Sequence, residues 1–288
     1  MLGPGFAWSA VARVEEKPMP DHRLRKIGFI LAATDHGPLI VNRFDHHTGQ
    51  DGRGFGVGFK ILNEPAHEAG EISIAALILE SRRRRFGDGV VVVDCRANMG
   101  IHTVSCATQM TGWGFVIAIE VQEQIYYALT GNLAINNCFN VRLIRAAGKN
   151  GIMKITNPAY LAPAGFGSLE LRPAKKPEQI GQTIDYSDPE FVSVDAITID
   201  SLALKRLDLL KIDVEGMECE VLEGAKRTIR QFLPIVIVEH LKTGTEEIVK
   251  FLRHHGYHMG ELGLNILAIH PTDKTIDGFG QQATFPTE

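Results

Sequence analysis

Two acidic residues stand where an open α/β sheet would bind a nucleoside. The run VVVDCRANMG places Asp94 after an apolar strand pattern and Gly100 at the start of a helical one, while Glu120 ends the next apolar run. An acid at the end of the second strand, about 20 residues after such a turn, is placed to accept hydrogen bonds from ribose hydroxyls. These residues therefore predict a nucleoside site.

The turn after Asp94 favours a ligand without phosphate. A dinucleotide pyrophosphate needs a GxGxxG turn so that backbone amides can approach the phosphates, and here Gly100 is the single glycine of the stretch. An adenosine without phosphate fits better, and S-adenosylmethionine (SAM) is the candidate cofactor. A NAD(P)-dependent oxidoreductase stays an alternative, because Glu120 would also suit its ribose.

A second group of ionisable side chains follows two later apolar runs, with Asp213 after one and Glu239 and His240 after the other. Methyl transfer to an alcohol requires removal of a proton. Imidazole titrates near neutral pH, so His240 is the first candidate for the general base, with Asp213 and Glu239 as further catalytic candidates. The three could also bind a divalent metal ion, but no metal-site spacing supports this, and we favour a site without metal.

A sheet must bring these two groups together. Apolar runs alternate with helical patterns, and because parallel strands need helical crossovers, the alternation predicts a doubly wound α/β sheet. The carboxyl ends of its strands would then share one crevice. The expected strands are 90–94, 115–120, 141–146, 207–213, 234–239 and 265–270, with helices after Gly100 and over 123–137, 217–232 and 245–255.

The chain divides into an extension and one catalytic domain. Residues 1–60 are weakly patterned and are expected to form an N-terminal extension with short strands, and residues 61–288 the domain. Within it, the Pro- and Gly-rich stretch 148–200 is an insertion, which we expect to determine the acceptor. No motif in it names that acceptor.

Composition limits the partners. The formal charge of −4 gives no general attraction to nucleic acid. Residues 71–85 predict a helix that ends in Arg82–Arg85; these cations suit the negative helix end or, alternatively, form a patch for an acidic substrate or nucleic acid. No apolar run is long enough to span a membrane, and four widely separated cysteines are typical of buried thiols, so we expect a cytoplasmic protein. The oligomeric state is left open.

Several motifs resemble one known family, the FkbM-type methyltransferases. The family's D-x-G-A-N-x-G turn, K-I-D-V-E-G-x-E fourth strand, L-x-G-A helix and P-x-x-x-x-E fifth strand occur in this order. They are matched by Asp94, Ala97, Asn98 and Gly100, by Lys211–Glu218, by Leu222–Ala225 and by Pro234–Glu239. The resemblance covers roughly residues 70–270, and four ordered motifs at expected strand ends make it specific.

The resemblance implies a Rossmann-like seven-stranded sheet, mostly parallel with an antiparallel last strand and helices on both faces. It also implies methyl transfer from SAM, often to a hydroxyl of a sugar, glycan or natural product. The residues expected to hold SAM are Asp94, Arg96, Ala97, Asn98, Gly100, Glu120 and Asp213.

Arg96 departs from the family, which usually has glycine at this position. A side chain here strains the backbone by about 1–3 kcal/mol and projects toward the cofactor pocket. Its guanidinium could clamp the methionine carboxylate of SAM, since the two groups match in geometry. Alternatively, the substitution marks a non-catalytic binding protein with an altered cofactor site.

Overall fold

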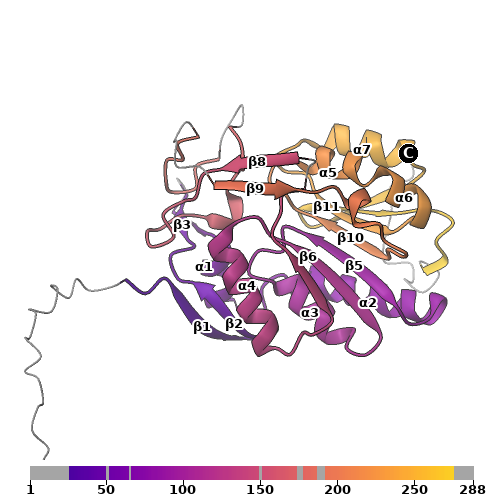
Figure 1. The fold of residues 1–288 in the computed structure, drawn as a ribbon, viewed down its shortest axis with the longest axis horizontal. Coiled ribbons are helices and arrows are strands. Elements are labelled where there is room, and N and C mark those ends of the chain that lie inside the picture. Colours follow the sequence, from indigo (N-terminus) through magenta and orange to yellow (C-terminus); the bar gives the residue numbers. More distant parts are fainter. Residues whose placement is uncertain are drawn as a thin grey trace, which may run out of the picture.

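The computed structural model describes residues 26–49, 52–64, 66–148, 151–173, 178–186 and 192–275. Its centre is a seven-stranded sheet in the order β12-β13-β11-β10-β5-β6-β7. Figure 1 labels β5, β6, β10 and β11 of this sheet. β13 pairs antiparallel with both of its neighbours, and the pairs from β11 to β7 are parallel. The strands are β5 (Val90–Cys95), β6 (Gly114–Ile119), β7 (Val141–Ile144), β10 (Leu209–Ile212), β11 (Ile235–Glu239), β12 (His258–Leu262) and β13 (Asn265–Ile269).

Helices cover both faces of this sheet, because successive strand residues point to opposite sides. In β5, Val90 and Val92 belong to one apolar cluster, and Val93 and Cys95 to the other. The first cluster includes side chains of α2 (Ala69–Phe86), α3 (Ile101–Gln109) and α4 (Glu123–Ile135). The second includes side chains of α5 (Glu218–Gly224), α6 (Lys226–Phe232) and α7 (Thr245–His254).

Smaller elements pack around this core. β1 (Phe29–Thr34) and β2 (Gly37–Asn42) form an antiparallel hairpin whose Leu39 and Val41 are fully buried in the first cluster. β3 (His47–Thr48), β4 (Gly54–Phe55) and α1 (Val57–Asn63) follow it. β8 (Gly151–Ile155) pairs with β9 (Val192–Ala196), and short 3₁₀ helices span Phe166–Ser168 and Ile199–Leu202.

The predicted fold is confirmed: the sheet is seven-stranded, mostly parallel, with an antiparallel last strand. One expected helix differs, because residues 217–232 form two helices, α5 and α6, that meet at Ala225. Because a new helix begins at Lys226, the backbone N–H groups of its first turn have no hydrogen-bond acceptor within the helix. Asp200 accepts two of them, from Arg227 at 3.0 Å and from Thr228 at 2.8 Å.

The side chains of Arg82–Arg85 do not form one common patch. Arg82 is buried and its Nη2 lies 2.6 Å from Asp273 Oδ2, whereas Arg84 and Arg85 are exposed. The described helices include none that is both long and apolar enough to cross a membrane.

Candidate active site

A cavity of about 1630 Å³ opens at the carboxyl ends of β5, β10 and β11. This is the edge where ligands bind in open α/β sheets. Its inner wall includes Arg96 and Asn98 from the turn after β5, Asp213 and Glu215 after β10, and Glu239 at the end of β11. The cavity therefore brings together residues separated by more than 100 positions in the sequence.

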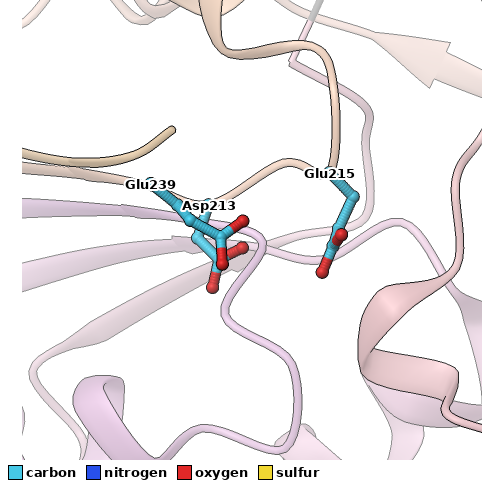
Figure 2. A group of neighbouring side chains, drawn as sticks. All are labelled: Asp213, Glu215 and Glu239. Atoms are coloured by element: carbon cyan, nitrogen blue, oxygen red, sulfur yellow. The ribbon is translucent and has the colours of Figure 1, made fainter. Parts of the chain in front are cut away.

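Three of the carboxylates that line this cavity lie close together (Figure 2). One oxygen from each of Asp213, Glu215 and Glu239 lies within 4.8 Å of the others. Figure 2 shows Asp213 and Glu239 side by side, with Glu215 on the loop that follows β10. Parallel neighbours β10 and β11 end next to each other, which explains why the first two lie so close.

The environment of Glu239 suits proton transfer near neutral pH. Burial, together with the nearby negative charges of Asp213 and Glu218, raises the pKa of Glu239 to about 7, although Arg96 and Lys211 act in the opposite direction. A carboxyl group with such a pKa can accept a proton at neutral pH and still release it readily. Glu239 thus lines the cavity with a pKa close to neutral pH.

His240, the first candidate from the sequence, is placed differently. It does not line the cavity, and its Nδ1 lies 2.8 Å from Thr245 Oγ1 at the start of α7. Successive residues at a strand end point to opposite sides, so when Glu239 points into the cavity, His240 points elsewhere. Of the two residues, Glu239 lines the cavity and His240 does not.

Cations already neutralise much of the acidic cluster. Glu215 Oε1 lies 3.0 Å from Arg96 Nη1, and Glu215 Oε2 lies 2.6 Å from Lys242 Nζ. Lys211 Nζ lies 3.5 Å from Asp213 Oδ2. Both oxygens of Glu215 are therefore paired with cations, although the three carboxylates lie close enough together to hold a metal ion.

Arg96 adopts the backbone conformation that favours glycine. Its φ is +67°, in the left-handed region, which costs a residue with a side chain about 1–2 kcal/mol. The guanidinium is buried, and besides its contact with Glu215 it donates from Nη2 to the carbonyl of Leu169 at 2.9 Å. A ligand carboxylate would have to compete with these partners for Arg96.

Glu120 lies beneath the surface of the site. The residue has no exposed area; Oε2 accepts the N–H of Asn98 at 2.9 Å, and Oε1 accepts that of Gln122 at 2.8 Å. Burial raises the pKa of Glu120, while Arg96 and these N–H groups oppose the shift. Its carboxylate therefore stabilises the backbone at Asn98 and at Gln122, and it does not line the cavity.

The other expected cofactor residues support the same turn. Asp94 is buried; its Oδ2 accepts the hydroxyl of Thr103 at 2.6 Å, and its Oδ1 has no hydrogen-bond partner. Ala97 donates its N–H to the carbonyl of Ile119 at 2.9 Å. Gly100 has φ +95° at the start of α3, and an added Cβ would lie 2.4 Å from a Leu129 methyl. Neither Asp94, Ala97 nor Gly100 lines the large cavity.

Sequence reasoning missed Lys242 and Asp45. Lys242 Nζ lies 2.8 Å from Glu178 as well as close to Glu215, and donates to the carbonyl of Ser168 at 2.8 Å. The sequence did offer one indication of its role, because Lys242 follows Glu239, the acid that ends β11, by three residues. Asp45 is fully buried and accepts the N–H groups of Gly58 and Phe166 at 2.9 and 2.8 Å. Nothing in the sequence around it marks this role.

Comparisons with known structures give distant similarities. Methyltransferase FkbM from Methylobacillus flagellatus KT is 14% identical with a TM-score of 0.44, over 64% of this chain and 44% of that one. The precorrin-6y C5,15-methyltransferase of Geobacter metallireducens GS-15 is 16% identical with a TM-score of 0.38, over 68% and 85%. A SAM-dependent methyltransferase from Aquifex aeolicus is 14% identical with a TM-score of 0.35, over 70% and 96%.

The chain thus spans less than half the length of the first of these structures. Comparison with curated proteins gives no significant match. The family comparison is more informative, because residues 94–259, more than half of the 288-residue chain, match the methyltransferase FkbM domain. That range includes the turn after β5, the acidic cluster and the ends of β10 and β11. The chain therefore belongs to the methyltransferase FkbM family.

Proposed function

We propose that this protein transfers a methyl group from SAM to a hydroxyl group of a sugar, glycan or natural product. The observation that carries the proposal is the position of Glu239, a carboxyl group with a pKa of about 7, beside Asp213 in a large cavity at the carboxyl ends of the strands. An alcohol must lose a proton when it is methylated, and Glu239 is suited to accept it.

SAM would supply the methyl group, and the protein would orient the acceptor and hold its proton. In this assignment Glu239 accepts the proton of the hydroxyl. Asp213 would orient the same hydroxyl, because one of its carboxylate oxygens lies within 4.8 Å of an oxygen of Glu239 (Figure 2). The ammonium group of Lys211 lies 3.5 Å from Oδ2 of Asp213 and pairs with this carboxylate.

The lining of the cavity supports a polar acceptor. Its outer wall comes from the inserted region, with Glu170, Arg172 and Glu178, and from helices α5 and α7. Charged side chains of both signs can donate to and accept from several hydroxyl groups at once. We therefore favour an acceptor with many hydroxyl groups over an apolar one.

The residues fit SAM only in part. Arg96, Asn98 and Asp213 line the cavity, where they could meet the amino-acid end of the cofactor. The nucleoside end does not fit in the described conformation, because Glu120 is fully buried and both of its oxygens accept backbone N–H groups. No position for the ribose follows from this arrangement.

Calorimetry with SAM and with its demethylated product tests the proposal. We expect both to bind in the micromolar range. Transfer of a labelled methyl group to a panel of sugars and hydroxylated natural products then identifies the acceptor. Failure of both ligands to bind the parent protein would sink the proposal.

One observation favours a second candidate, a non-catalytic binding protein of methyltransferase ancestry. Arg96 is engaged by Glu215 and by the carbonyl of Leu169, in a place where the family usually has glycine. Binding of SAM to Arg96→Gly but not to the parent would establish this candidate. The NAD(P)-dependent alternative has no comparable observation in its favour.

A further inference from the structure

Residues 164–171, from the inserted region, cover the end of β6, and we call them the strap. They pass next to Gln122, two positions after Glu120. Gln122 Nε2 donates to the carbonyl of Phe166 at 3.0 Å, and the Tyr160 hydroxyl donates to Gln122 Oε1 at 2.9 Å. The rings of Phe166 and Tyr160 pack at 4.8 Å. Glu120 and Gln122 are buried, so this cover excludes ligands from both.

Two cations hold the other side of the strap. Arg96 Nη2 donates to the carbonyl of Leu169 at 2.9 Å, and Lys242 Nζ donates to that of Ser168 at 2.8 Å. Both cations also contact Glu215, at 3.0 and 2.6 Å. Glu215 therefore fixes the two donors that hold the strap, and all three side chains come from cofactor-side loops of the sheet.

The amino-terminal part of the chain supplies a further anchor. Asp45 Oδ1 accepts the N–H of Phe166 at 2.8 Å, while its Oδ2 accepts that of Gly58 at 2.9 Å, in α1. Gly165 and Gly167 flank Phe166, and an added Cβ would lie 2.8 and 2.6 Å, respectively, from a neighbouring side chain, so the backbone packs closely at both positions. Phe166 is thus held by the side chains of Asp45 and Gln122 and by its ring contact, and its own side chain is fully buried in the first apolar cluster.

We infer that the strap is a displaceable cover of the nucleoside side of the site, closed in this structure, which must swing away before SAM can bind. The inference rests on the proposed function. Its physical basis is an exchange of partners: the SAM carboxylate can replace the carbonyl of Leu169 on Arg96, and its adenosine can replace Phe166 beside Gln122. Arg96 and Gln122, which hold the strap in place, are thus also the residues that SAM would contact.

A reversible lock tests this inference. If a Cβ is added at Gly167, it lies 3.7 Å from the Cβ of Val57 in α1, which is close to the usual separation of about 3.8 Å across a disulfide. The double variant Val57→Cys/Gly167→Cys should therefore cross-link when oxidised. Calorimetry then measures SAM binding to the oxidised and the reduced forms, with the parent and Val57→Cys alone under the same treatment as controls.

We expect the reduced double variant to bind SAM and the oxidised form to bind at least tenfold more weakly. Equal affinity of the two forms would overturn the strap and leave the proposed function intact. Failure of the parent, the reduced form and Arg96→Gly to bind would instead overturn the proposed function and, with it, the strap.

Hydrogen exchange gives a readout that does not depend on turnover or on the lock. The N–H of Phe166 is bonded to Asp45 and should exchange slowly in the free protein. Addition of SAM should speed exchange in residues 164–171 at least tenfold, while β10 stays protected. Unchanged or slower exchange in the strap on SAM binding would contradict its displacement.

Discussion

Glu120 Oε2 accepts the backbone N–H of Asn98 over 2.9 Å and thereby joins the end of β6 to the turn after β5. Asn98 has φ +52°, so the turn is in a conformation that few residues adopt without support. The acid at the end of the second strand is therefore part of the scaffold in this conformation, before any ligand is considered.

Replacement of Glu120 should destabilise the fold. Glu120→Ala leaves the N–H groups of Asn98 and Gln122 without an acceptor, and each buried unsatisfied group costs about 1–3 kcal/mol. Urea unfolding should show this loss as a lower midpoint. Glu120→Gln keeps one acceptor oxygen and should lose about half as much. An unchanged midpoint in Glu120→Ala would show that the two N–H groups find other partners.

Glu239 and His240 can be separated by matched variants. Glu239→Gln should lower kcat by about 10²–10⁴-fold, the usual contribution of a general base, with little effect on SAM affinity. His240→Ala should change kcat less than about threefold, because its ring contacts Thr245 outside the cavity. Steady-state kinetics at saturating SAM makes the comparison. The reverse ranking of the two variants would assign the base to His240.

The rate should depend on pH through the same carboxyl group. Burial and the neighbouring negative charges raise the pKa of Glu239 to about 7, and the base must be deprotonated to act. We therefore expect kcat to rise tenfold per pH unit below about 7 and to level off above it. A rate that stays flat between pH 5 and pH 7, in a protein shown to remain folded, would contradict this assignment.

Chelation should leave the protein active. Both oxygens of Glu215 contact cations, Arg96 at 3.0 Å and Lys242 at 2.6 Å, so the acidic cluster has little net charge left for a divalent ion. We expect the methyl-transfer rate to be the same before and after treatment with EDTA, and added Mg²⁺ or Mn²⁺ to have no effect. Loss of activity on chelation that either ion restores would reverse this expectation.

Arg82 should matter for stability far more than its neighbour. Arg82→Ala leaves the buried Asp273 carboxylate without the guanidinium that now lies 2.6 Å away, and loss of one partner of a buried pair costs about 3–5 kcal/mol. Arg84→Ala, at an exposed position of the same helix, should cost less than about 0.5 kcal/mol. Thermal unfolding of the two variants compares them directly, and equal effects would contradict the ion-pair explanation.

The sequence by itself determined the fold and the place of the site. Apolar runs separated by helical patterns fix which segments are strands, and motifs at strand ends must gather at one edge, because parallel strands share a direction. That reasoning placed Asp213 and Glu239 at the same edge of the sheet, and the structure brings their carboxylates together. It also marked Arg96 as a departure, since a position that usually holds glycine has a left-handed backbone.

Only the tertiary structure decided which side chains face the cavity. Side chains alternate along a strand, so the exact residue at which β11 ends determines whether Glu239 or His240 points into the cavity. Glu120 is enclosed by residues that are distant in the sequence, such as those near Phe166. Local patterns carry no information on such contacts, because the strap belongs to the Pro- and Gly-rich stretch of the insertion between β8 and β9. The burial that raises the pKa of Glu239 arises from packing between distant segments, and sequence spacing does not encode it.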